Sequence, residues 1–228
     1  TEIYTLSLHD ALPIWDSPEN PICMSSGPLG GTTSFPGSGK TIVTSISPLT
    51  HSVMDCNVGG YFGPYLKFAG FDAICIVGKA TEDVIIYIDS INHKITIEKN
   101  TVESKDSHLI SEDLTSILAD DEMDKKNIAV VSTGSAAEYT RMGILNFSFW
   151  DWRRGVARLK QAGRGGIGTV FKDKKIRALA IKNNEMLRPW KVAENKVASK
   201  ITSQIYKSPH GTVNLQEIRE VADKWQIG

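Results

Sequence analysis

The sequence predicts an α+β fold that contains an internal repeat. One passage occurs twice, first as GGYFGPYLKFAGFDAICIVGK over Gly59–Lys79 and again as GGIGTVFKDKKIRALAIKN over Gly165–Asn183. The β-branched segments are short, and two of them flank a tight turn at Asn92-His93, which is typical of hairpins rather than of alternating βαβ units. Beyond about residue 190, apolar residues recur at helical spacing. We therefore expect a mixed domain followed by the start of an α-helical domain.

The two copies of the passage superimpose with one gap. The paired positions are Gly59-Gly60 with Gly165-Gly166, Gly63 with Gly168, Lys67 with Lys172, Ala73 with Ala178 and Ile76 with Ile181. Each copy predicts a glycine turn, a short helix and a buried strand. Adjacent glycines let backbone N–H groups approach a ligand, and such turns suit phosphates, so two copies indicate a ligand with two similar halves. Duplicated packing, with glycines where helix and strand cross closely, is the alternative.

The remaining elements follow from β-branched clusters and helical spacing. Strands are expected at Ile22–Ser25, Thr41–Ile46, Ala73–Val77, Val84–Ile88, Ile95–Ile97, Asn127–Ser132 and Arg177–Ile181. Loops are expected at 27–39 and 48–60. A helix is predicted over Leu109–Leu118, with Ser111 as a simple N-cap. Beyond Pro189, helices are predicted at Val192–Tyr206 and Val213–Trp225.

These elements divide the chain into three parts. Residues 1–14, TEIYTLSLHDALPI, match the translation of an adapter used in DNA sequencing libraries and predict a non-native segment, with an ordinary N-terminal strand and turn as the alternative. Residues 15–189 form the predicted N-terminal domain, and residues 190–228 the beginning of a truncated helical domain. We expect a fragment that is open at both ends.

Composition excludes several classes of function. Lys plus Arg and Asp plus Glu each number 26, so the chain has no overall basic field for nucleic acid. No apolar run reaches the roughly 20 residues needed to cross a bilayer. The three cysteines, Cys23, Cys56 and Cys75, are widely spaced, and they indicate neither a zinc site nor a disulfide framework. We therefore expect a cytoplasmic protein.

Three short motifs could carry chemistry. GSGKT at Gly37–Thr41 lacks the first glycine of a nucleotide-binding P-loop and leads into a strand, so Lys40 remains only a cation beside a glycine loop. AGRGG at Ala162–Gly166 places Arg164 where its guanidinium group can bind a phosphate or a planar heterocycle. The alternative is that Arg164 forms a salt bridge at a turn. NFSFWDWRRG at Asn146–Gly155 could stack RNA bases, but a half-buried cover loop or a subunit contact is favoured.

Together these stretches resemble the N-terminal domain of the aldehyde ferredoxin oxidoreductase family of tungsten or molybdenum enzymes. The resemblance runs through SPEN at Ser17–Asn20, SGPLGGT at Ser26–Thr32, SPLT at Ser47–Thr50, NVGGYFGPYLKFAGFDA at Asn57–Ala73 and AGRGGIG at Ala162–Gly168. It implies a two-sheet, sandwich-like α+β domain with an internal pseudo-twofold repeat. This domain would form the base for two pyranopterins that grip one tungsten or molybdenum, with their phosphates bridged by magnesium.

The resemblance also implies roles for individual residues. One pterin would lie against the backbone of Asn57, Val58, Gly59 and Gly60, and the other against Lys160, Gln161, Gly163, Arg164 and Gly165, with Lys40 between pterin and iron–sulfur cluster. Asn57 and Gln161 would offer main-chain carbonyls to magnesium. The catalytic residues and the cysteines that ligate the [4Fe–4S] cluster are expected beyond Gly228.

In the family, an aldehyde is oxidised to a carboxylic acid and electrons leave through ferredoxin or an electron-transfer subunit. A homo-oligomer is a further candidate assembly. The family often has arginine at the position of Lys40 and Arg-Ala at Lys160-Gln161. These departures indicate a side branch. Two alternatives therefore remain: an enzyme that reduces an aromatic thioester or another substrate on the same cofactor, and a non-catalytic structural subunit with the same fold.

Overall fold

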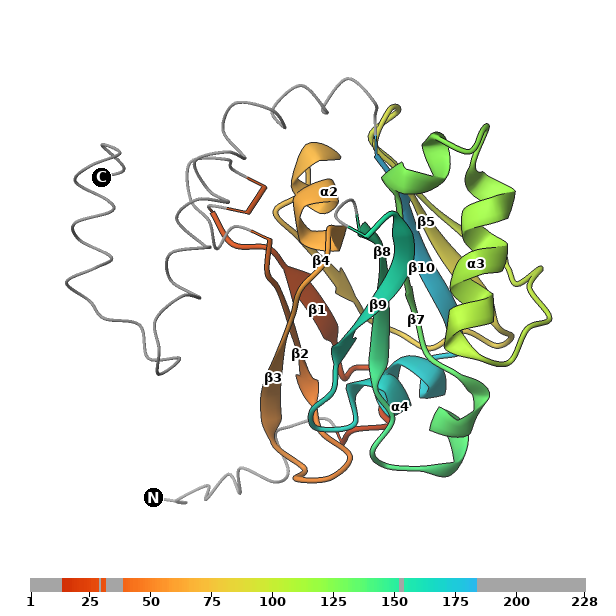
Figure 1. Cartoon of the computed structure of the whole chain (residues 1–228). Helices are drawn as coiled ribbons and strands as arrows, with labels where there is room; N and C mark the ends of the chain where they lie inside the picture. The colour runs from red at the N-terminus through yellow and green to blue at the C-terminus, as the bar shows by residue number, and fades with distance from the viewer. Residues whose placement is uncertain (1–13, 29, 32–38, 152–153, 184–228) are drawn as a thin grey trace, which may run out of the picture.

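A computed structural model of the chain describes residues 14–28, 30–31, 39–151 and 154–183. These residues form two β-sheets with few helices (Figure 1). The prediction of a mostly two-sheet domain is therefore confirmed. The predicted helices beyond Pro189, and all but the last residue of the segment 1–14, lie outside the described residues.

The first sheet has four strands in the order β3-β2-β1-β4. Its strands are β1 (Ile22–Ser25), β2 (Thr41–Ile46), β3 (Val53–Val58) and β4 (Ala73–Ile76). All neighbouring pairs are antiparallel. Ile22 and Met24 of β1 and Val43 of β2 are buried toward the second sheet. The predicted bounds of β1 and β2 are confirmed.

The second sheet has six strands in the order β6-β5-β10-β7-β8-β9. They are β5 (Val84–Asp89), β6 (Lys94–Lys99), β7 (Ile128–Ser132), β8 (Leu145–Asp151), β9 (Val156–Ala162) and β10 (Ile176–Lys182). Strand β10 pairs in parallel with β5 and antiparallel with β7, and its residues are nearly all buried. The predicted hairpin is confirmed, since β5 pairs antiparallel with β6 across the turn that contains His93.

Three helices complete the described fold: α2 (Phe62–Phe68), α3 (Ser107–Leu118) and α4 (Ile167–Asp173). Helices α2 and α4 contribute Phe62, Leu66, Val170 and Phe171 to the main core between the sheets. Helix α3 covers the outer face of the six-stranded sheet, where Ile110 and Leu114 form a second core (Figure 1). Two short 3-10 helices, Asp124–Asn127 and Ser135–Tyr139, lie on either side of β7 in the chain.

The two repeated passages have the predicted order of turn, helix and strand. The first forms α2 and β4, and the second forms α4 and β10. The prediction of two buried strands is wrong for the first copy, because β4 is an edge strand whose residues alternate between exposed and half-buried. Only β10 lies in the interior of its sheet.

Three other predictions need correction. The expected loop at 48–60 contains β3, and the expected cover loop at Asn146–Gly155 contains most of β8. Helix α3 begins at Ser107 and is capped by Asp106, whose side chain accepts a hydrogen bond from the backbone N–H of His108. Ser111 instead lies inside the helix, and its hydroxyl donates to the carbonyl oxygen of Ser107.

The spacing of the cysteines indicated no disulfide framework, but the structure contains a disulfide. Cys23 and Cys75 lie directly opposite each other on β1 and β4, and the structure joins them in a disulfide. Cys56 on β3 is buried and free.

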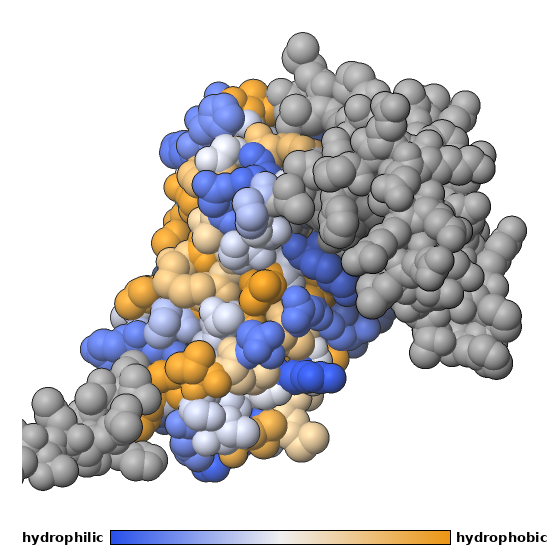
Figure 2. Space-filling model, turned by 90° about the vertical axis from the view of Figure 1, so that its left-hand side faces the viewer, coloured by the Kyte–Doolittle hydropathy of each residue, from blue (hydrophilic) through white to orange (hydrophobic). Residues whose placement is uncertain are grey.

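On the left-hand side of Figure 1, which Figure 2 shows face on, apolar residues are interspersed with polar ones. In the described residues no helix is long and apolar enough to span a membrane.

Candidate functional site

The two predicted binding segments end neighbouring strands of different sheets. Asn57 and Val58 close β3, and Gly59-Gly60 forms the turn that leads into α2. Lys160 and Gln161 lie near the end of β9, and Gly163–Gly166 forms the turn that leads into α4. Strand β3 is at the edge of the four-stranded sheet and β9 at the edge of the six-stranded sheet, and the two edges contact each other.

Two lysines meet beside the first glycine turn. A methyl group on the Cα of Gly59 would lie 3.9 Å from Cγ of Lys160 and 4.0 Å from Nζ of Lys40. Gly39, just before Lys40, also lies close to the carbonyl oxygen of Gly60. The structure therefore brings together three predicted residues that are far apart in the sequence.

A second contact joins the same two strands. A methyl group on Gly165 would overlap the side chain of Met54, near the start of β3. The repeat pairs Gly59 with Gly165, and the same offset pairs Met54 with Lys160. The contact of Met54 with Gly165 and the contact of Lys160 with Gly59 therefore involve the same two positions of the repeat, with the two copies exchanged.

The turn glycines differ in what they face. Gly166 has φ +72°, and a methyl group there would overlap the main-chain oxygen of Arg141, so backbone packing requires glycine. Around Gly163 the nearest atom to such a methyl group is 4.0 Å away, and Gly59 faces only the two lysine side chains. Packing thus accounts for Gly166, whereas Gly59 and Gly163 present open backbone that suits a ligand.

The surroundings of the two lysines are cationic. In the described part of the chain, no ion pair is formed by Lys40 or Lys160. At the end of β8, the carboxylate of Asp151 forms ion pairs with Arg154 at 3.0 Å and Arg158 at 3.1 Å. Burial raises the pKa of the Tyr61 phenol, and the charge of Asp151 raises it further, so Tyr61 stays neutral near pH 7. An anionic group would find uncompensated positive charge here.

The other predicted residues differ in their exposure to solvent. Asn57, Gln161 and Arg164 are exposed, and Val58 is buried in the core. The described residues contain no cluster of three or more His, Cys, Asp or Glu side chains that could hold a metal ion, so no such cluster lies beside Asn57 or Gln161. A magnesium ion held by main-chain carbonyls would not need such a cluster.

Sequence reasoning missed the aromatic residues of the site. Phe149 on β8 packs against Gly60, and its ring meets that of Tyr61 edge to face at 5.8 Å between centroids. Lys160 Nζ lies 5.7 Å from the centroid of the same ring. In NFSFW the apolar Phe147 and Phe149 alternate with polar Ser148, and this alternation was the signal that could have identified the strand, whose first residues are buried.

A pocket of about 300 Å³ lies between α3 and the β8–β9 hairpin. Its lining includes Glu112, Thr115 and Trp150, and also Phe149. Because successive strand residues point to opposite faces, Trp150 and Phe149 face away from each other. None of the predicted site residues lines this pocket.

Comparisons with known proteins agree with this architecture. The family model described as aldehyde ferredoxin oxidoreductase, N-terminal domain, matches residues 4–183. The tungsten-containing aldehyde ferredoxin oxidoreductase of Pyrococcus horikoshii is 36% identical over 171 residues, which are 74% of this chain and 25% of the relative. The enzyme of the same name from Thermococcus kodakarensis is 35% identical over 173 residues, again 74% and 25%.

A solved structure is similar as well. It is the active site complex BamBC of benzoyl coenzyme A reductase in complex with 1,5-dienoyl-CoA, with a TM-score of 0.65 and 26% sequence identity. The likeness covers 88% of this chain and 29% of that one. The chain thus spans about a quarter of the length of the curated relatives. With its two sheets and paired glycine turns, it belongs to the aldehyde ferredoxin oxidoreductase family and corresponds to the N-terminal domain.

Proposed function

We propose that this chain is the cofactor-binding domain of a tungsten-dependent oxidoreductase that oxidises aldehydes to carboxylic acids, with ferredoxin as electron acceptor. The observation that carries the proposal is the meeting of Lys40, Gly59 and Lys160 at the contact between β3 and β9. Two lysines that form no ion pair within the described residues, in contact with open backbone, suit the phosphates of a pterin cofactor.

The residues present fit a tungsten or molybdenum bis-pyranopterin. The backbone of Asn57–Gly60 would hold one pterin, and Lys160, Gln161, Gly163, Arg164 and Gly165 the other. The main-chain carbonyls of Asn57 and Gln161 would bind magnesium. When bound, the cofactor supplies the redox chemistry at its metal, and the protein supplies binding, orientation and electrostatics. The [4Fe–4S] cluster would be ligated by residues outside this chain.

The chain's own residues have separate tasks in this proposal. Lys40 places its ammonium group beside Gly59, and Lys160, whose methylene groups pack on the same glycine, adds a second positive charge over Phe149; both charges lower the free energy of an anionic group placed there. Arg164 is exposed in a glycine-flanked turn, so its fork is free to donate two hydrogen bonds to one phosphate or one planar ring. The reciprocal contacts of Met54 with Gly165 and Lys160 with Gly59 support a ligand with two similar halves and a pseudo-twofold relation between the segments.

One alternative has a specific observation in its favour. The likeness to the benzoyl coenzyme A reductase complex supports a relative that reduces an aromatic thioester on the same cofactor. Since that structure is a complex of subunits, it also supports an electron-transfer subunit or a homo-oligomer as partner. We further propose a cytoplasmic location, in which small aldehydes and ferredoxin are both accessible.

The experiment that tests the proposal measures cofactor retention. The chain is produced in a host that makes tungsten pterin cofactor, and tungsten and pterin are quantified per chain. We expect Lys40→Ala combined with Lys160→Ala to lower both contents together. Lys99→Ala is the matched control, because Lys99 is an exposed lysine at the far edge strand β6. Equal metal content in the double variant and the control would overturn the proposal.

A further inference from the structure

Lys160 lies over an aromatic ring instead of beside a carboxylate. Its Nζ is 5.7 Å from the centroid of Phe149, within the roughly 6 Å at which a ring face attracts a cation. Lys160 is exposed, and among the described residues no acidic side chain forms an ion pair with it. The ring is therefore the attractive partner that the structure provides for this ammonium group.

The ring itself is fixed from two sides. Its first side-chain atoms would lie 3.7–3.8 Å from a methyl group on Gly60, so the glycine backbone and the ring are in contact. The ring of Tyr61 meets it at an interplanar angle of 87°, which is the favourable edge-to-face arrangement. Phe149 is also held in register on β8, opposite Arg158 of β9. The ring thus has a defined position beside the first glycine turn.

We propose that Phe149 is a positioning residue that holds the ammonium group of Lys160 at the Gly59 turn without neutralising it. The inference rests on the proposed function, because it assigns Lys160 to an anionic group of the cofactor. A carboxylate in place of the ring would also attract Lys160, but it would compensate the charge and repel the anion. The ring leaves the full positive charge available.

Lys160 needs an attractive partner because Lys40 lies beside the same turn. Lys40 places its ammonium group at Gly59, on which the methylene groups of Lys160 also pack, and like charges repel each other. Without an attractive partner, the long exposed side chain of Lys160 would move away into solvent. Attraction to the ring offsets this repulsion before any ligand arrives, so less ordering remains to be done on binding.

The first test observes Lys160 directly in the free chain. Lysines are reductively methylated with ¹³C formaldehyde, which keeps their charge, and the Lys160 resonance is assigned from its loss in Lys160→Arg. We expect this resonance to be shifted upfield by the ring of Phe149. The shift should disappear in Phe149→Leu and persist in Phe149→Tyr. A Lys160 resonance at the position of ordinary exposed lysines would overturn the proposal.

The second test measures anion affinity with inorganic pyrophosphate as the probe. We expect Phe149→Leu to bind about three- to tenfold more weakly than the unmodified sequence, and Phe149→Tyr to bind nearly as well. Trp150→Leu is the matched control, because this ring lies on the opposite face of β8 under Lys126. Phe149→Met, which keeps volume without a ring, replaces the leucine variant if thermal melting shows that leucine unfolds the chain.

The outcomes separate the two proposals. If Lys160→Ala weakens pyrophosphate binding and Phe149→Leu does not, the role of Phe149 is overturned and the proposed function stands. If neither Lys40→Ala nor Lys160→Ala changes the affinity, the proposed function is overturned. In that case the positioning role falls with it, even where the Lys160 resonance shows the ring contact.

Discussion

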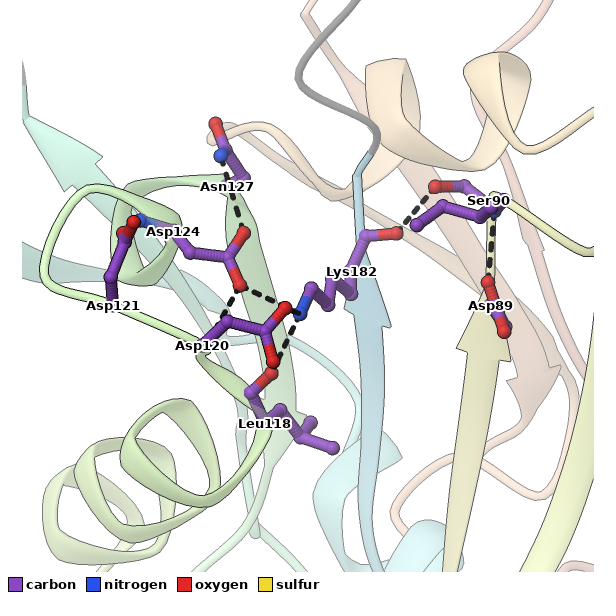
Figure 3. A network of polar contacts seen from close by, with 9 residues as sticks. Asp89, Ser90, Leu118, Asp120, Asp121, Asp124, Asn127 and Lys182 are labelled. Atoms are coloured by element: carbon purple, nitrogen blue, oxygen red, sulfur yellow. Dashed lines mark hydrogen bonds and ion pairs between the residues drawn. The ribbon is translucent and has the colours of Figure 1, made fainter.

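The ammonium group of Lys182 at the end of β10 lies 2.6 Å from the carboxylate of Asp124, just beyond the C-terminal end of α3 (Figure 3). The same Nζ lies 2.7 Å from Asp120 and donates to the carbonyl oxygen of Leu118 at 3.0 Å. Asp124 is nearly buried, whereas the side chain of Asp120 is 89% exposed. This network fastens the last described strand to the helix that covers its sheet.

Asp124→Asn should destabilise the chain by about 1–3 kcal/mol at pH 7, because it leaves Lys182 with only an exposed carboxylate partner. Asp120→Asn, which removes the exposed partner of the same lysine, is the control and should cost at most about 0.5 kcal/mol. Urea unfolding of both variants provides the measurement. Equal losses for the two variants would show that burial does not matter here.

The contribution of this pair should depend on pH in a defined direction. Burial alone would raise the pKa of Asp124, but hydrogen bonds from Lys182 and from the backbone of Asp120 outweigh it and lower the pKa. A lowered folded-state pKa means that the stabilisation is complete above the ordinary carboxyl value of about 4 and is lost as pH falls through the folded-state value. The difference between the unmodified chain and Asp124→Asn should therefore shrink in acid. A difference that stays constant down to pH 2 would contradict this.

Gly166→Ala should destabilise the fold by about 2–4 kcal/mol, because the added methyl group would overlap the main-chain oxygen of Arg141 at a positive φ. Gly163→Ala, three residues earlier in the same turn, has open space and should change the free energy of unfolding by less than about 1 kcal/mol. Thermal melts of the two variants test this contrast. Similar melting temperatures would mean that the turn relaxes easily around Gly166.

Gly59→Ala should have the opposite effect, with little change in stability but a loss of bound cofactor. Its methyl group would meet only the side chains of Lys40 and Lys160 at about 4 Å, so folding should be little affected. The methyl group would nevertheless cover the open backbone beside the ammonium group of Lys40. We expect bound tungsten and pterin to decrease while the melting temperature of the metal-free chain stays within a few degrees. Unchanged cofactor content would remove Gly59 from the proposed site.

Arg164→Ala should lower bound metal and pterin and leave the metal-free chain nearly as stable as before, since Arg164 is exposed in its turn. A charge-assisted hydrogen bond to the cofactor corresponds to about a ten- to hundredfold change in affinity. Arg164→Lys should recover only part of the bound metal and pterin, because the point charge of an ammonium group does not replace the paired hydrogen bonds of a guanidinium group. Elemental analysis beside a thermal melt decides between the roles. A collapse of stability without the metal would identify Arg164 as a structural turn residue.

Local sequence patterns were sufficient for much of the fold. The bounds of β1 and β2 and the hairpin between β5 and β6 follow from β-branched runs and turn residues, which depend on neighbours in the chain. Strand β3 was missed because it is half-buried, with exposed Asp55 and Asn57 alternating with buried Cys56 and Val58. This alternation over few residues is difficult to distinguish from a polar loop.

The sequence by itself determined the family and the repeated turn–helix–strand units, and it predicted the residues of the candidate site, including Lys40, Gly59 and Lys160. Only the tertiary structure decided that these three residues meet, that Phe149 lies beneath Lys160, and that packing requires Gly166 whereas Gly59 remains open. Residue type and spacing carry chemistry and local conformation. The contact between β3 and β9 instead joins edges of two different sheets, and it arises only when burial of the shared core stacks those sheets.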